Sequence, residues 1–163
     1  MSPVALFLLV ALVSQALPSE LEEQREFEAA LVDRDRSKYV WLYVNENPYV
    51  SHEFMELVAN AIQSESDEVS RQAIRLLEKI GPQAAEFDEV VLPFLAHEDP
   101  FFRIAAIECL GSMRPGRFYP EIAHLAVFDE DDSMHYGKFD SVHFAAIRVL
   151  VKSESLEAVP YIM

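Results

Sequence analysis

An acidic stretch at residues 129–140 comes closest to the spacing of a chemical site. Its first four residues are Asp, Glu, Asp and Asp, and carboxylate oxygens are the ligands that Ca²⁺ prefers. A calcium-binding EF-hand loop, however, needs glycine at its sixth position and glutamate at its twelfth. This chain has Met134 and Asp140 there. We therefore interpret the stretch as a solvated acidic loop or a contact for a partner, rather than as a metal site.

The side chains that commonly carry catalysis are few and scattered. The single cysteine, Cys109, cannot form a disulfide within the chain. Small and aliphatic neighbours predict that it is buried and behaves as a hydrophobe, whereas a catalytic thiol needs a base and some exposure. No zinc-protease, phosphate-loop, nucleophile-elbow or paired-cysteine motif occurs. We expect no catalytic residue, no cofactor and no metal, although histidines stand at His52, His97, His124, His135 and His143.

The charge balance restricts the class of partner. The chain has 13 Lys and Arg against 28 Asp and Glu, which gives a net charge of -15. We expect no binding to nucleic acid, because phosphates require a basic surface, and anionic membrane surfaces should also repel the chain. The acidity serves either solubility alone or the binding of a protein that carries a basic patch.

Residues 1–16 resemble a secretory signal peptide. An unbroken apolar run covers 4–13, and small residues stand on the amino-terminal side of a cleavage site after Ala16. The run is short for a transmembrane helix, and no Lys or Arg precedes it. We expect export to the periplasm or out of the cell. The alternatives are an uncleaved membrane anchor and the buried first helix of a cytoplasmic protein.

Helices account for most of the remaining chain. Only four glycines occur in 163 residues, and apolar side chains recur with the spacing of amphipathic helices. Aromatic residues gather near 39–49 and 101–119; we assign them to the core, with an aromatic-lined ligand groove as the alternative. The expected helices cover 19–33, 39–44, 51–63, 69–80, 84–96, 101–113, 118–128 and 141–152, and one more starts at 156.

A sequence pattern repeats along this helical part. Segment 71–77 (RQAIRLL) is echoed 32 or 33 residues later by 103–111 (RIAAIECLG), and the pattern returns 40 residues further on at 143–150 (HFAAIRVL). Self-similarity at such a period is typical of stacked helical repeats. The paired small residues let neighbouring helices approach closely, and the leucines fill the seam between repeats. The longer second step accommodates the acidic stretch.

These motifs resemble HEAT repeats, especially the short bacterial kind. Segment 99–111 (DPFFRIAAIECLG) is close to the second helix of such a repeat. Segments 91–95 (VLPFL) and 158–162 (AVPYI) resemble its first helix, which carries an early proline. The copy at 67–77 matches less well, and the third copy has histidine in place of the arginine. The resemblance extends over about residues 51–163.

The resemblance implies an all-α fold, an α-solenoid of stacked antiparallel helical hairpins. Terminal hairpins of such a stack need a specialised outer face, so we expect 19–48 to form a degenerate N-terminal helical cap. The half-repeat at the carboxyl end is a short cap, the start of a longer array, or an edge that docks on a partner. The expected repeats cover about 51–80, 84–113 and 117–152, with the half-repeat at 155–163.

The resemblance also implies roles for particular residues. In the family, Asp and Arg residues near the start of the second helices form a ladder between successive repeats, which implies a structural role for Asp67, Arg71, Asp99 and Arg103. We expect a non-catalytic scaffold that binds a protein or peptide through its helical-repeat surface and the acidic loop at its rim. The residues expected to contact the partner are Asp129, Glu130, Asp131, Asp132, His135 and Tyr136.

Enzymatic relatives supply the alternatives. HEAT-like di-iron hydroxylases carry His-Glu pairs within the second helix of a repeat. Here the pairs at 52–53 and 97–98 fall at a helix start and in a turn, and Phe144 follows His143. That pattern argues against an iron enzyme. Some short HEAT-like proteins are lyases that attach pigments to carrier proteins. An enzyme accessory or lyase-like protein acting on a carrier protein is therefore the alternative function.

Overall fold

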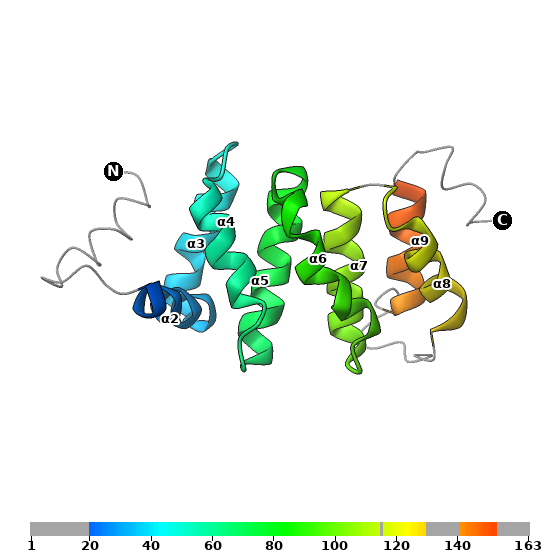
Figure 1. The fold of residues 1–163 in the computed structure, drawn as a ribbon, viewed down its shortest axis with the longest axis horizontal. Helices are drawn as coiled ribbons and strands as arrows, with labels where there is room; N and C mark the ends of the chain where they lie inside the picture. The colour runs from blue at the N-terminus through cyan, green and yellow to red at the C-terminus, as the bar shows by residue number, and fades with distance from the viewer. Residues whose placement is uncertain (1–19, 115, 130–140, 153–163) are drawn as a thin grey trace, which may run out of the picture. The chain divides into compact units, whose positions relative to one another are not determined.

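The computed structural model describes residues 20–114, 116–129 and 141–152 (Figure 1). Within these ranges the chain is helical, with no strand, as the sequence predicted. No helix in the described ranges is long and apolar enough to cross a membrane. The expected signal peptide at 1–16, loop residues 130–140 and the half-repeat at 155–163 lie outside the described residues.

The chain divides into two compact units, the first ending at Leu76 and the second beginning at Leu77. The first unit contains α2 (Glu20–Val32), α3 (Arg34–Glu46), α4 (His52–Ala61) and most of α5 (Asp67–Ile80). Helix α2 packs against both α3 and α4. An aromatic cluster forms the centre of this packing, because the ring of Phe54 lies 5.7 Å from that of Phe27 and 4.9 Å from that of Tyr43.

Helix α3 starts five residues earlier than the short helix that the sequence predicted at 39–44. The Asp33 side chain accepts hydrogen bonds from the backbone N–H groups of Asp35 (2.9 Å) and Arg36 (2.8 Å). It therefore caps the helix, and the charged residues form its first turn. Helix α4 starts where the sequence predicted a helix, and the Ser51 hydroxyl caps it by accepting from the N–H of Phe54 at 3.3 Å.

The second unit contains η1 (Gly81–Phe87), α6 (Asp88–Val91), η2 (Leu92–Ala96), α7 (Pro100–Met113), α8 (Tyr119–Phe128) and α9 (Val142–Lys152). The single helix expected at 84–96 is divided into α6 flanked by two 3-10 helices. Pro82 and Pro93 stand at the starts of η1 and η2. Proline lacks the N–H group that a continuous α-helix would use, so the ladder of hydrogen bonds is interrupted there.

Helix α7 is the centre of the second unit. The η1–α6–η2 segment packs on it, α9 packs beside it, and α8 packs on α9. The contact between α7 and α9 is close at Gly111, because a β-carbon built there would overlap the Val149 side chain. The Leu-Gly pair that ends the repeat pattern thus lets two successive second helices approach each other.

Burial fixes the register of the repeat at 33 residues rather than 32. The pairs 73 and 106, 74 and 107, 76 and 109, 77 and 110, and 80 and 113 are buried at both members. The 40-residue step to α9 preserves burial at Ala146 and Leu150, but not at Ile147. That side chain is 43% exposed, whereas its counterparts Ile74 and Ile107 are fully buried.

Candidate protein-binding site

The first stem of the 129–140 loop is fixed by an ion pair between α7 and the end of α8. The Arg103 guanidinium donates two hydrogen bonds of 2.8 Å to the Asp129 carboxylate, from Nε to Oδ2 and from Nη2 to Oδ1. The two side chains are 13% and 4% exposed. Such a two-pronged arrangement is the strong form of a charge-assisted pair, because the planar fork of arginine matches a carboxylate.

Arg103 also holds the turn that precedes its own helix. Its Nη1 donates to the backbone carbonyls of His97 (2.8 Å) and Glu98 (3.0 Å). In the same turn, the Asp99 side chain caps α7 by accepting from the N–H of Phe101 at 2.8 Å. Arg103 therefore connects three elements: the end of η2, helix α7 and the end of α8. Asp129 is held in place by its bonds to this arginine.

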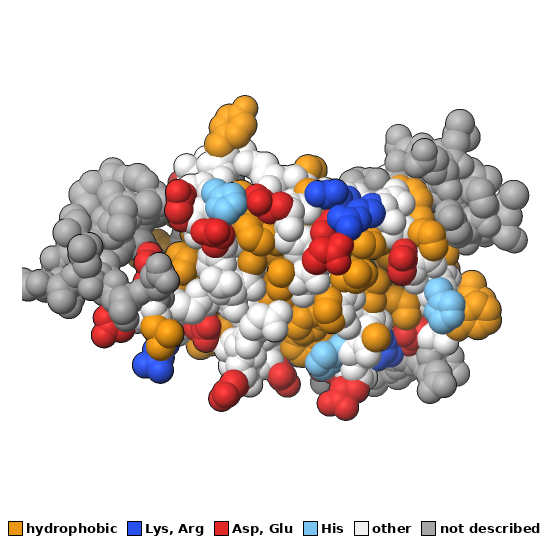
Figure 2. Space-filling model, viewed as in Figure 1, with side chains coloured by type: hydrophobic (Ala, Val, Ile, Leu, Met, Phe, Trp, Pro, Cys, Tyr) orange, Lys and Arg blue, Asp and Glu red, His pale blue; other side chains and the backbone are white. Residues whose placement is uncertain are grey.

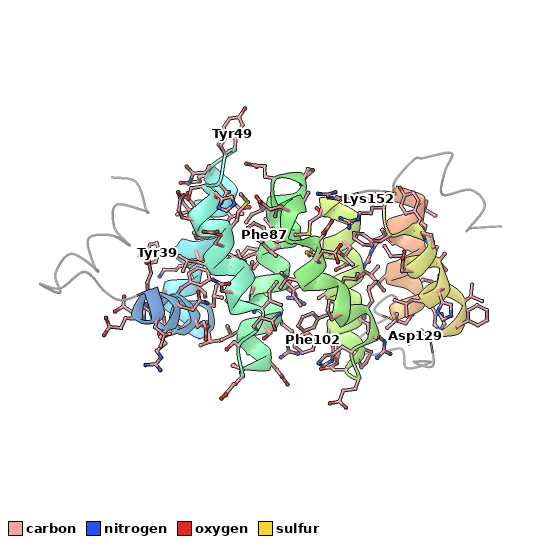
Figure 3. All side chains as sticks on the ribbon, viewed as in Figure 1. Tyr39, Tyr49, Phe87, Phe102, Asp129 and Lys152 are labelled. Atoms are coloured by element: carbon pink, nitrogen blue, oxygen red, sulfur yellow. The ribbon has the colours of Figure 1, made fainter. Side chains whose placement is uncertain are left out.

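The second stem of the loop is fixed at the start of α9. Ser141 is buried, and its hydroxyl accepts a hydrogen bond from the N–H of Phe144 at 3.3 Å. The Nδ1 atom of His143 lies 3.1 Å from the backbone carbonyl of Ala126 in α8. Figure 3 shows Asp129 at one end of the hairpins and Lys152 at the other. Both stems therefore emerge from packed helix ends.

Two large apolar side chains are exposed directly before the loop. Val127 is 63% exposed and Phe128 is 66% exposed at the end of α8, and hydrophobic side chains are visible on this part of the surface in Figure 2. The His124 ring lies 4.9 Å from the ring of Phe128. These two residues were not among the partner contacts predicted from the sequence. The available signal was the run of apolar residues from 125 to 128, because all of them cannot face one core.

Of the predicted partner-binding residues, Asp129 is the one that the structure describes. Asp129 is a structural residue, since its buried carboxylate is engaged by Arg103. We therefore no longer expect Asp129 to contact the partner. The other predicted contacts, Glu130, Asp131, Asp132, His135 and Tyr136, lie outside the described residues.

The four predicted ladder residues do not occupy equivalent positions in their repeats. With the 33-residue register, the counterparts of Asp99 and Arg103 are Ser66 and Ser70, not Asp67 and Arg71. Ser70 donates to the carbonyl of Ser64 at 3.3 Å, six residues back, as Arg103 does to His97. Ser66 accepts from the N–H of Val69 at 3.5 Å. Arg71 instead pairs with Glu68 of its own helix at 2.8 Å, and Asp67 lies in the exposed first turn of α5.

A second buried carboxylate has a structural role that the sequence did not reveal. The Asp88 side chain is 2% exposed and forms ion pairs with Arg117 and, at 3.1 Å, with Arg114. Both arginines belong to the connection between α7 and α8. Because a buried carboxylate needs partners for its charge, Asp88 ties this connection to the start of α6.

The Cys109 thiol belongs to the packed interior. Cys109 is buried, and burial followed by the negative charge of Glu78 raises the pKa of its thiol well above the ordinary value of 9.0. Its sulfur lies 3.7 Å from the Met113 sulfur. In the described part of the chain, no three His, Cys, Asp or Glu side chains are grouped so that they could hold a metal ion.

Stacked antiparallel hairpins with inter-hairpin ion pairs define an α-solenoid of helical repeats. A comparison with family models matches residues 55–134 to the HEAT repeats, and this part of the chain belongs to that family. No curated protein and no solved structure shows a significant match. HEAT repeats commonly mediate interactions between proteins, and proteins built from them are generally non-catalytic scaffolds.

Proposed function

We propose that the protein is a non-catalytic scaffold that binds a protein or peptide partner at the surface around the 129–140 loop. The observation that carries the proposal is the pair of anchored stems: Arg103 holds Asp129 on one side, and Ser141 with His143 holds the other. A binding loop on a rigid base loses less conformational entropy when its partner binds.

The composition of this surface suggests the chemistry of the partner. Val127 and Phe128 are exposed apolar side chains that suit the role of anchors. The loop adds carboxylates at Glu130, Asp131 and Asp132, in a chain whose net charge is -15. An apolar anchor bordered by acidic groups fits a peptide in which an apolar side chain is flanked by Lys or Arg.

Affinity capture from the native cell envelope fraction tests this proposal. The wild-type chain is compared with a variant that lacks residues 130–138 and with the double variant Val127→Ser, Phe128→Ser. The matched control is Leu21→Ser, Tyr49→Ser, which removes two exposed apolar side chains of the first unit. We expect the first two variants to lose the partner that the wild type and the control retain. An unchanged set of captured proteins would refute the role of this surface.

Two further measurements address charge and location. The affinity for the captured partner should fall as salt rises, because exposed charges are screened over about 10 Å at 0.1 M salt. An affinity that is indifferent to salt would remove the acidic loop from the proposal and leave the apolar anchors. We also propose that the protein is exported; amino-terminal sequencing of the mature protein should then begin after residue 16.

A further inference from the structure

Helix α9 carries an exposed apolar stripe on one face. Phe144 and Ile147 are each 43% exposed and Val151 is 56% exposed. They are spaced at i, i+3 and i+7, so they lie along one side of the helix. The counterpart of Ile147 in α7 is Ile107, which is fully buried in the unit where α9 packs on α7. The centre of the stripe on α9 therefore corresponds to a position that is covered in the preceding repeat.

The charges around this stripe differ in sign from the chain as a whole. Helix α9 contains Arg148 and Lys152 and no acidic residue, whereas the chain has a net charge of -15. Arg148 pairs with Glu108 of α7. Lys152 stands at the end of the helix, next to the exposed Val151. Because Glu108 already pairs with Arg148, an occupant of the stripe should be apolar on one side and acidic where it meets Lys152.

We propose that residues 153–163 of the same chain cover this stripe. The segment directly follows α9, and its apolar residues Leu156, Val159 and Ile162 recur every three positions. Its charged residues are Glu154 and Glu157, with no Lys or Arg. Both the spacing and the sign of charge match α9, and the covalent connection gives the segment a high effective concentration there.

A related segment within the structure supports this assignment. Val159-Pro160-Tyr161-Ile162 repeats the order of residue types in Leu92-Pro93-Phe94-Leu95. The latter residues belong to η2, which packs on α7 and buries Leu95. The precedent concerns the types of residue alone, because the place on α9 that corresponds to η2 on α7 is held by α8. The inference does not depend on the proposed partner-binding function.

Thiol labelling of the full-length chain tests the inference. Cys109 is fully buried, so a newly introduced cysteine can be followed without removing it. Ile147→Cys reports on the stripe, and Lys79→Cys, at an exposed position of α5, gives the rate of an open site. Each is measured alone and together with Leu156→Asp, Val159→Asp. The matched control is Ser153→Asp, which adds charge without removing an apolar side chain.

We expect Ile147→Cys to react at least about tenfold more slowly than Lys79→Cys, because a covered thiol reacts only when the cover opens. The protection should disappear with the two aspartates and persist with Ser153→Asp. Equal rates at the two sites would overturn the proposal, as would protection that survives the two aspartates. Protection that rises with protein concentration, with a dimer mass by light scattering, would assign the cover to a second copy and also overturn it. If Cys109 becomes reactive, the alanine pair Leu156→Ala, Val159→Ala replaces the aspartates.

Discussion

Gly111 of α7 faces Val149 of α9, and the space between them excludes a side chain. Replacing Gly111 by alanine should lower the free energy of unfolding by about 1–3 kcal/mol, the usual cost of overpacking. The sign is diagnostic, because alanine in an ordinary helix position would stabilise by about 1 kcal/mol relative to glycine. Denaturant unfolding followed by circular dichroism measures the change. A more stable variant would show that the two helices can separate at no cost.

A compensating substitution should recover part of this loss. In the background of Gly111→Ala, the change Val149→Ala removes the methyl groups that the new β-carbon meets. We expect the double variant to be more stable than the sum of the two single effects predicts, since residues in contact are not additive. Strict additivity would contradict a direct contact between the two positions.

Breaking the ion pair between Arg103 and Asp129 should lower the free energy of unfolding far more than breaking an exposed ion pair. Arg103→Met leaves a buried carboxylate and two carbonyls without their donor, and we expect a loss of about 3–5 kcal/mol. The control is Arg148→Met, which removes a partner of Glu108; the Arg148 side chain is 49% exposed. A pair of that kind contributes about 0–1 kcal/mol. Equal losses for the two variants, measured by urea unfolding, would contradict the assigned importance of burial.

The Cys109 thiol should be unreactive in the native protein and should make the free energy of unfolding fall at alkaline pH. Burial raises the pKa of its thiol above the ordinary 9.0, so the unfolded chain ionises first. The stability contributed by the neutral thiol is complete below that ordinary value and is lost as pH rises above it. Between about pH 8 and about pH 10, wild type should lose more stability than Cys109→Ala. Parallel loss in both proteins would refute this.

Glu68 should give the stability of the fold the opposite dependence on pH, in the acidic range. A hydrogen bond from the Gln72 side chain, followed by the interaction with Arg71, lowers the pKa of the Glu68 carboxyl below the ordinary 4.5. Its contribution is therefore present above that value and is lost as pH falls through the lower, folded-state pKa. We expect the Gln72→Ala variant to bring the pKa of Glu68 back toward 4.5, as measured by NMR titration of the side chain. An unshifted titration would remove Gln72 as the cause.

The sequence predicted the helices well where apolar spacing was regular and the cap was simple. Ser51 and the apolar positions of α4 are an example. It failed where one residue type has two uses. Asp33 was expected to end the helix at 19–33 and instead caps the next helix, and Pro93 was expected inside one helix at 84–96 and divides it. The register of the repeat required burial, because arginines and leucines align it differently.

The site was harder to predict than the fold because side-chain partners come from distant segments. Asp129 belongs by composition to the acidic loop, yet it is bonded to Arg103, 26 positions away. Conversely, Ser70 has no resemblance to an arginine, yet it makes the equivalent contact to the preceding turn. Hydrophobic residues at 127 and 128 read as core in a linear pattern, and only the packing of α8 reveals that they are exposed.

The ion pair at Asp129 also has a consequence for how this chain can be altered. Arg103 holds Asp129, the residue directly after α8, and Ser141 and His143 hold the start of α9. We therefore expect the spacing between the two helices not to depend on the number of residues that join them. Loop closure entropy grows slowly with length. Foreign peptides of varied length should therefore be tolerated between 130 and 140. Such a position is suited to the insertion and display of a peptide on the helical repeats.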